Sequence, residues 1–224
     1  MTCVYYQLGC LDYEEAYRLQ ERLWSEKAAG REDDFLLLLE HPPTLTIGKS
    51  GKLSNLLVDK EELTRQGLSL YFTDRGGDIT YHGPGQLVAY PLVDLRRRRK
   101  DVHRYIHELE EVVIGLLAEL GVAAGRDAEH IGVWVGREKL CAIGVRVRRW
   151  ITMHGLALNV EPDLKHFNLI TPCGIVGRGV TSLARLLGQP PAMDEVKERF
   201  VAHFGRVFGA TMERGEHTPL GGAA

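Results

Sequence analysis

Two long stretches of the chain repeat apolar residues at the spacing of an α-helix. Residues 12–29 begin with Asp12, a residue type that caps helix N-termini. Residues 101–120 repeat apolar side chains at intervals of three and four residues, and Gly121 follows as a preferred helix terminator. Both patterns predict amphipathic helices. Weaker patterns predict shorter helices over 59–66, 180–187 and 193–208.

Short apolar runs between these segments predict β-strands. The run 35–40 is almost continuously apolar, which is typical of a strand buried on both faces. Further strands are expected over 4–8, 44–47, 68–73 and 86–93. Three more runs, joined by turn residues, predict an antiparallel meander over 131–135, 140–147 and 151–160. Strands in runs with helices at intervals predict an α+β domain with a mixed β-sheet flanked by helices.

Length and composition narrow the class of protein. The 224 residues are 44% hydrophobic and 26% charged, as in a soluble globular chain, and no linker divides them. We expect one catalytic or binding domain over 1–208 and a flexible tail over 209–224. A formal net charge of −2 argues against a nucleic-acid-binding protein. The absence of a long apolar run or a signal-peptide pattern predicts a cytoplasmic protein without a membrane span.

Four cysteines offer candidate thiol chemistry. None forms a C-x-x-C pair, so a zinc site is not expected, and in a reducing cytoplasm no disulfide is expected either. Cys141 lies within an apolar strand pattern, which predicts a buried core thiol. Cys3 and Cys10 flank the first strand, and we expect the same of them. Cys173 lies between a proline and a glycine, in a turn where it is either a reactive nucleophile or a small residue that fills a gap.

A glycine-rich stretch over 75–86 is the second candidate for chemistry. Its four glycines allow close backbone approach, so the stretch can wrap a ligand with its N–H groups. It lacks the pattern of a phosphate-binding loop. The alternative is an irregular hairpin connection in which His82 is structural.

Three smaller features leave alternatives open. Lys139 opens a strand after a turn, where a lysine is either solvated or, if the fold brings it beside Cys173, able to favour the thiolate. Small residues alternate with leucines over 153–160, which provides space either for an apolar ligand or for tight strand packing. The basic run 96–100 is either a solvated loop or a docking surface for an acidic partner.

Four motifs in this order closely resemble the signature of the lipoyl(octanoyl) transferase family, the octanoyl-acyl-carrier-protein:protein N-octanoyltransferases. The first is the stretch from Arg75 to Tyr90 that reads RGGxxTYHxxGQxVxY. The second is KxxAIG from Lys139, and the third is HGxAxN from His154. The fourth is Pro-Cys-Gly around Cys173, followed by Val-Thr-Ser-Leu. Together they span most of the chain.

The resemblance implies the biotin/lipoate-protein ligase type of catalytic domain and a ping-pong, ATP-independent acyltransferase. Cys173 would carry the acyl group as a thioester, and Lys139 would lower the pKa of that thiol. The substrate-binding residues would be Arg75, Gly76, Gly77, Asp78, Ile79, Thr80, Tyr81, His82, Ala142, Ile143, Gly144, Gly155, Leu156 and Ala157.

The resemblance also implies the partners of this reaction. The donor would be octanoyl-acyl carrier protein, and the acceptors would be lipoyl domains of 2-oxoacid dehydrogenases and the glycine-cleavage H protein. The enzyme would be a monomer without a cofactor or metal, and it would bind neither nucleic acid nor membrane. Two alternatives remain: an ATP-dependent lipoate or biotin ligase, in which Cys173 would be dispensable, and a non-catalytic acyl-binding module.

Overall fold

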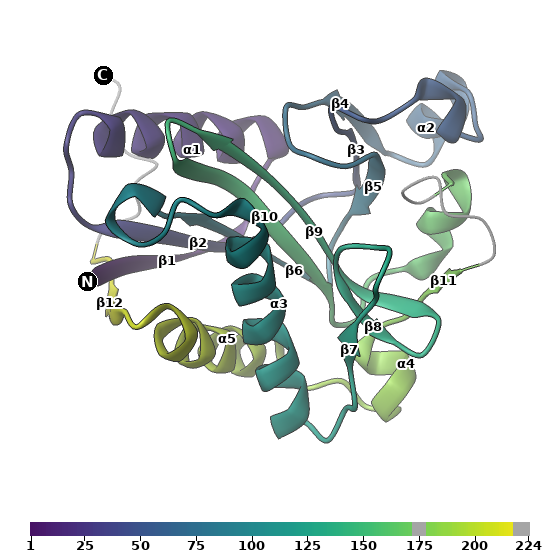
Figure 1. Ribbon diagram of the computed structural model, residues 1–224. Helices are drawn as coiled ribbons and strands as arrows, with labels where there is room; N and C mark the ends of the chain where they lie inside the picture. The colour runs from purple at the N-terminus through teal and green to yellow at the C-terminus, as the bar shows by residue number, and fades with distance from the viewer. Residues whose placement is uncertain (172–177, 217–224) are drawn as a thin grey trace.

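A computed structural model describes residues 1–171 and 178–216. A large mixed sheet carries helices on both faces, and a small three-stranded sheet lies beside it (Figure 1). The large sheet has the strand order β12-β1-β2-β6-β10-β9-β8-β7, and β11 pairs with β9. The small sheet has the order β4-β3-β5. The mixed, helix-flanked α+β fold predicted from the sequence is confirmed.

The elements agree with most of the predicted segments. The strands are β1 (Thr2–Cys10), β2 (Asp34–Glu40), β3 (Thr44–Ile47), β4 (Ser69–Phe72), β5 (Ile79–His82), β6 (Gln86–Leu92), β7 (Gly125–Arg126), β8 (Val133–Val135), β9 (Glu138–Arg148), β10 (Ile151–Asn159), β11 (Gly179–Val180) and β12 (Thr211–Arg214). The helices are α1 (Tyr13–Ala28), α2 (Lys60–Arg65), α3 (Val102–Glu119), α4 (Leu183–Leu187) and α5 (Met193–Phe208). Short 3₁₀ helices cover Leu53–Asn55, Leu95–Arg97 and Leu164–Leu169.

The large sheet is buried on both faces, as its continuous apolar strands predict. On β2, Leu36 and Leu38 join a core cluster with α3 and α5, whereas Phe35, Leu37 and Leu39 join a second cluster with α1. In Figure 1, α1 covers one face of the sheet, and α3 and α5 lie together on the other. Because side chains alternate along a strand, a strand between two layers of helix must be apolar at every position.

Both long helices begin where the sequence predicts. The side chain of Asp12 accepts a hydrogen bond from the N–H of Glu14 at 2.8 Å, and Asp101 accepts one from the N–H of Arg104 at 3.0 Å. The helix α3 ends before Gly121, whose φ of 74° lies in the left-handed region that favours glycine. The predicted meander is also confirmed, because β8, β9 and β10 pair antiparallel.

The sequence suggested that the glycine-rich stretch 75–86 is a loop throughout. In the structure, part of it is a strand. Ile79–His82 forms β5, which pairs antiparallel with β3 in the small sheet. Ile79 and Tyr81 pack in a third core cluster with Leu45 and Phe167. Two apolar residues between glycines are too few to give a recognisable period, so this strand depends on its pairing with β3.

Two differences arise near the C-terminus. The helix expected over 180–187 is shorter, because α4 begins at Leu183 and Gly179–Val180 pairs with β9 as β11. The tail expected over 209–224 contains β12, which pairs in parallel with β1, while 217–224 lie outside the described residues. Both short strands are stabilised by backbone pairing with a long neighbour, which apolar patterning does not reveal.

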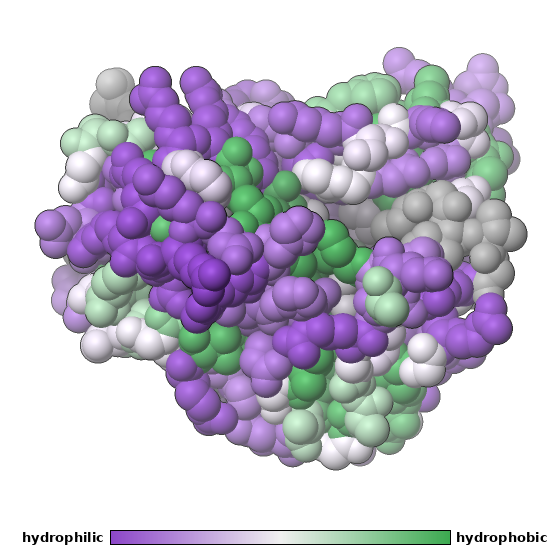
Figure 2. All heavy atoms as spheres, in the orientation of Figure 1, coloured by the Kyte–Doolittle hydropathy of each residue, from purple (hydrophilic) through white to green (hydrophobic). Residues whose placement is uncertain are grey.

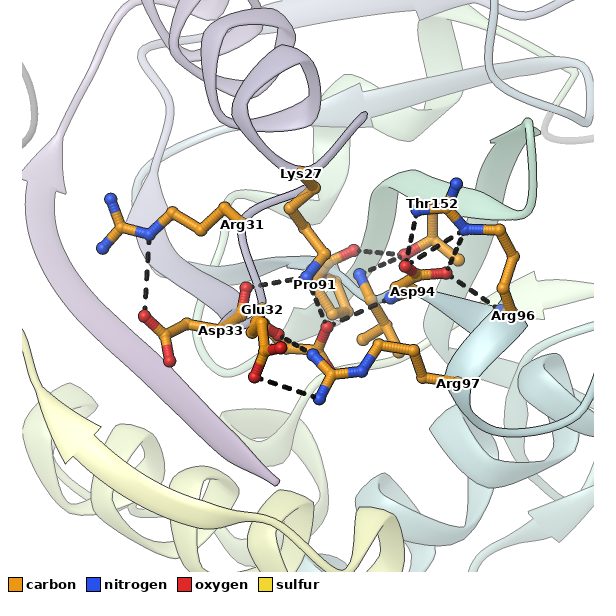
Figure 3. A network of polar contacts seen from close by, with 11 residues as sticks. Lys27, Arg31, Glu32, Asp33, Pro91, Asp94, Arg96, Arg97 and Thr152 are labelled. Atoms are coloured by element: carbon orange, nitrogen blue, oxygen red, sulfur yellow. Dashed lines mark hydrogen bonds and ion pairs between the residues drawn. The ribbon is translucent and has the colours of Figure 1, made fainter. Parts of the chain in front are cut away.

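A buried ion pair connects α1 to the large sheet (Figure 3). Lys27 Nζ lies 2.7 Å from Asp34 Oδ1 and also donates to the Asp33 carbonyl at 2.7 Å. The same Asp34 oxygen accepts the N–H of Asp94 at 3.1 Å. The end of α1, the start of β2 and the segment after β6 are therefore joined at one point, and hydrogen bonds satisfy the buried charges.

The basic run 96–100 contacts carboxylates rather than presenting unpaired charge. Arg96 lies 2.7 Å from Asp94, and Arg97 lies 3.7 Å from Glu32 (Figure 3). The next two arginines also lie near carboxylates, Arg98 with Glu108 at 3.6 Å and Arg99 with Asp101 at 3.8 Å. These pairs reduce the charge available to an acidic partner and favour the solvated-loop interpretation.

Among the described residues, none of the helices has both the length and the apolar character that a membrane span requires.

Candidate active site

A cavity of about 640 Å³ lies where β9 and β10 meet the small sheet and the start of α3. It brings together segments that are far apart in the sequence. Its lining includes all but one of the proposed site residues that the structure describes, namely Arg75, Gly76, Gly77, Asp78, Ile79, Thr80, His82, Lys139, Ala142, Ile143, Gly144, Gly155, Leu156 and Ala157. Cys173 lies outside the described residues.

Tyr81 is the exception, because its side chain points into the core beside the cavity. It is 1% exposed, and its hydroxyl lies 2.9 Å from His166 Nδ1. Its neighbours Thr80 and His82 line the cavity. Side chains alternate along β5, so Tyr81 faces the third core cluster and stabilises the wall from behind.

Aliphatic side chains form one wall of the cavity. Val102 and Ile106 come from α3, Ile143 and Val145 from β9, and Ile131 from the segment before β8. Figure 2 shows hydrophobic residues near the middle of the face seen in Figure 1, surrounded by largely hydrophilic residues. A concave apolar wall with a few polar groups opposite it is typical of a site for a small ligand with an aliphatic part.

Arg75 organises the glycine-rich loop from inside. Its guanidinium donates to the carbonyls of Gly76, Thr46 and Asp78 at 2.9, 2.7 and 2.7 Å, and to Thr46 Oγ1. The residue is 8% exposed. Arg75 was predicted to line the substrate site. Because its guanidinium binds backbone carbonyls of the loop, it also fixes the shape of the cavity wall.

A chain of buried hydrogen bonds leads from His82 toward Lys139. His82 Nδ1 donates to Gln86 Oε1 at 2.8 Å, and Gln86 Nε2 donates to Asn159 Oδ1 at 2.9 Å. Asn159 then donates to the carbonyl of Thr181 at 2.9 Å, and the Thr181 N–H donates to the Lys139 carbonyl at 3.0 Å. Burial, together with nearby cations, lowers the pKa of His82 to about 3, so its ring is neutral at pH 7.

His154 is held in an unusual backbone conformation at the cavity wall. Its φ is 57°, which is rare outside glycine, and its N–H donates to Gln20 Oε1 at 2.7 Å. Its Nε2 lies 2.9 Å from Asp74 Oδ1, and Arg146 lies 2.6 Å from the other Asp74 oxygen. Burial lowers the pKa of His154, and the hydrogen bond from His154 lowers the pKa of Asp74.

Three more rings near the cavity were not among the predicted site residues. Tyr13 and Tyr90 line it, and His41 Nε2 lies 2.8 Å from the Tyr90 hydroxyl. The rings of Tyr13 and His82 stack with centroids 6.4 Å apart. Burial lowers the pKa of His41 to about 4. Tyr90 ends the motif that carries the resemblance, whereas Tyr13 and His41 gave no sequence signal, because each is isolated in its own segment.

The small residues of β9 and β10 serve strand packing at two positions. A Cβ on Gly155 would lie 2.1 Å from the Ala89 carbonyl oxygen, and a Cβ on Gly144 would lie 2.9 Å from that of Gly76. The sequence left two interpretations open for 153–160, and tight packing applies at Gly155; Gly144 on β9 is packed closely as well. Both still line the cavity, because close packing brings the backbone to its surface.

Lys139 is 9% exposed, although a lysine after a turn is usually solvated. Its Nζ lies 4.8 Å from the centre of the Trp134 ring. The segment that contains Cys173 is connected to the cavity region on both sides. The Thr171 N–H donates to the Asn55 carbonyl at 2.8 Å, and Val180 pairs with Lys139 across β11 and β9.

The other three cysteines divide by burial. Cys3 and Cys141 are fully buried, as predicted, and burial raises the pKa of both thiols. Cys10 is exposed, so the expectation of a core thiol was wrong there. It is the last residue of β1. Among the described residues, no group of three or more His, Cys, Asp or Glu side chains is arranged to hold a metal ion.

The chain is similar to known proteins over most of its length. Residues 12–205 match the family described as the lipoyl protein ligase A/B catalytic domain. An octanoyltransferase of Desulforamulus reducens is 49% identical over 203 residues, which cover 90% of this chain and 89% of the relative. An octanoyltransferase of Caldicellulosiruptor saccharolyticus is 51% identical over 205 residues, 91% and 87% of the two chains.

A solved structure of lipoate-protein ligase A with bound ATP superposes with a TM-score of 0.79 at 17% identity, covering 97% of this chain and 89% of that one. At that identity the superposition supports the fold alone. The two relatives cover about nine-tenths of the chain, and the family match over 12–205 includes every described cavity segment. This chain therefore belongs to the lipoyl protein ligase A/B catalytic domain family.

Proposed function

We propose that this enzyme transfers an octanoyl group to the lysine of a lipoyl domain, the first step of protein lipoylation. The observation that carries the proposal is the identity of about half the residues to octanoyltransferases over nine-tenths of the chain. The cavity supports it, because its aliphatic wall suits a fatty acyl chain. Burying an eight-carbon chain contributes about 0.8 kcal/mol per CH₂ to binding, so the wall supplies several kcal/mol.

The proposed chemistry has two half-reactions. The Cys173 thiolate attacks the carbonyl of an octanoyl thioester, forms a new thioester and releases the carrier thiol, which takes up a proton. The amine of the acceptor lysine then attacks the acyl-enzyme, loses a proton and forms an amide as the Cys173 thiol is restored. Backbone N–H groups near the cavity would stabilise each oxyanion, and the apolar wall would exclude water that hydrolyses the intermediate.

Lys139 is proposed to favour the Cys173 thiolate. The described residues on either side of the segment that contains Cys173 contact the cavity region. Thr171 is joined to Asn55, whose amide donates to the cavity residue Asp78 at 2.5 Å. On the other side, β11 runs beside Lys139 itself. These contacts of the flanking residues support the proposal that Lys139 acts on Cys173.

The proposed donor is octanoyl-acyl carrier protein, and the proposed acceptors are lipoyl domains of 2-oxoacid dehydrogenases and the glycine-cleavage H protein. The donor thioester is already activated, so transfer needs no ATP. One cavity must serve both macromolecules in turn, which gives a ping-pong cycle. The ATP-dependent ligase alternative keeps the fold but would form an acyl-adenylate and dispense with Cys173.

Intact-protein mass spectrometry separates these alternatives. Wild type is mixed with octanoyl-acyl carrier protein without ATP, and a lipoyl domain is added afterwards. We expect one octanoyl adduct that disappears as the lipoyl domain gains the same mass. Cys173→Ser should give no thioester adduct, and Cys10→Ser, which removes the exposed thiol, should behave as wild type.

Two results would contradict the proposal. Unchanged transfer by Cys173→Ser would exclude the covalent mechanism. Transfer that appears only when ATP and free octanoate are supplied would place the chain with the ligases instead.

A further inference from the structure

Trp134 and Lys139 are directly opposite each other across β8 and β9. The pairing register shifts by one residue here, because Val133 pairs with Cys141 whereas Trp134 pairs with Lys139. Leu140 is thus an extra residue on β9, and both Leu140 and Cys141 are buried. A bulge of this kind interrupts side-chain alternation and re-aims a residue, often beside an active site. Here it places the lysine over the indole ring.

The contact has the geometry of a cation–π interaction. Lys139 Nζ lies 4.8 Å from the ring centre, within the roughly 6 Å over which an ammonium is attracted to an aromatic face. Trp134 is 4% exposed and Lys139 is 9% exposed, so solvent screens the attraction between them only weakly. Lys139 also has its aliphatic stem against Gly132, where a Cβ would lie 3.5 Å from Cε.

The indole is itself held in place on three sides. Its Nε1 donates to the His130 carbonyl at 3.1 Å, and the His130 ring lies edge-on with centroids 6.1 Å apart. The guanidinium of Arg178 lies 5.1 Å from the same ring centre and forms an ion pair with Asp127. Arg178 is the first described residue after the segment that contains Cys173. Trp134 thus contacts both Lys139 and Arg178.

We infer that Trp134 is a positioning residue: its indole face holds the Lys139 ammonium at the cavity wall and so sets its separation from the nucleophile. This inference rests on the proposed function. A lysine side chain has four flexible carbons, and an ammonium gains hydration by turning toward solvent. Burial deprives the ammonium of part of its hydration, and attraction to the aromatic face offsets part of that loss.

The test follows the alkylation of Cys173 by iodoacetamide as a function of pH, because only the thiolate reacts. Peptide-resolved mass spectrometry separates Cys173 from the exposed Cys10. The variants are Trp134→Leu, which removes the aromatic face, and Trp134→Phe, which keeps a weaker one. Trp24→Leu is the matched control. Trp24 is 8% exposed, its ring centre lies 4.9 Å from the guanidinium of Arg148, and it does not line the cavity.

We expect Trp134→Leu to raise the midpoint of the alkylation profile by about one pH unit, which is a tenfold slower reaction below both midpoints. Trp134→Phe should shift the midpoint less, and Trp24→Leu should not shift it. Octanoyl transfer at pH 7 should fall in the same order, through kcat rather than KM for the donor. At pH 9.5, where the thiol ionises in every variant, the rates should converge.

The inference is wrong if folded Trp134→Leu keeps the wild-type midpoint, or if Trp134→Phe shifts it as far as Trp134→Leu. Circular dichroism and thermal unfolding establish that each variant is folded. A further variant, Lys139→Ala, distinguishes this failure from failure of the proposed function. If Lys139→Ala raises the midpoint and Trp134→Leu does not, only the role of Trp134 is refuted. If wild type already has an ordinary thiol midpoint near 8.5, the proposed activation of Cys173 fails first.

Discussion

Replacing Gln86 with leucine removes the side chain at the centre of the buried hydrogen-bond chain beneath the cavity. Gln86 is 1% exposed and joins three groups at once. Its Oε1 accepts from His82 at 2.8 Å, and its Nε2 donates to Asn159 Oδ1 at 2.9 Å and to the Tyr81 carbonyl at 3.2 Å. Leucine fills a similar volume, so the change isolates the loss of polar partners from the creation of a cavity.

The expected destabilisation follows from these three partners. A buried polar group left without a hydrogen bond costs about 1–3 kcal/mol. Because neighbouring groups share the same network and relax together, the three losses do not add fully. We expect the free energy of unfolding to fall by about 4 kcal/mol, which lowers the Tm by about 8–16 °C for a chain of this size.

Urea unfolding followed by circular dichroism measures the change directly. The matched control is Gln66→Leu, which replaces an exposed glutamine at the C-terminal cap of α2 and should alter stability by less than about 0.5 kcal/mol. If Gln86→Leu loses less than about 1 kcal/mol with an unchanged m value, the buried hydrogen bonds do not contribute as argued.

Two further outcomes are expected. Gly155→Ala should destabilise the protein by about 1–3 kcal/mol, because the added Cβ would lie 2.1 Å from the Ala89 carbonyl oxygen and force β10 from β6; a variant as stable as wild type in thermal unfolding would contradict this packing. Burial lowers the pKa of His82 to about 3 and that of His41 to about 4, so the unfolded chain binds more protons than the folded chain below about pH 6.5. The contribution of these two histidines to the free energy of unfolding should therefore be constant above pH 6.5 and fall between pH 6.5 and pH 4. The fall should be steeper in wild type than in His41→Gln. Equal slopes in the two proteins would refute the buried neutral state of His41.

The long elements were predictable because their patterns are local. An amphipathic stripe with a capping aspartate predicted α1 and α3, and a continuous apolar run predicted β2. The motifs around Arg75, Lys139 and His154 singled out segments that line one cavity in the structure. Periodicity and motif order survive in the chain itself, without knowledge of its neighbours.

Elements that depend on a distant partner were missed or misjudged. Residues 79–82 and 211–214 become strands because β3 and β1 offer unpaired backbone groups. Tyr81 was expected in the site by resemblance, but the alternation of β5 turns it into the core. Cys10 was expected in the core, but it lies where β1 reaches solvent.

The sequence by itself determined the fold class, the family resemblance and the segments that carry the chemistry. Tertiary structure alone decided that Lys139 is buried against Trp134, that Arg75 holds its own loop, and that His154 has a positive φ. The physical reason is that helix and strand preference arises from neighbours along the chain. Burial, charge environment and ring contacts arise from packing in three dimensions. Packing joins Arg75 to Thr46 and His154 to Gln20, and the register shift between β8 and β9 places Lys139 opposite Trp134.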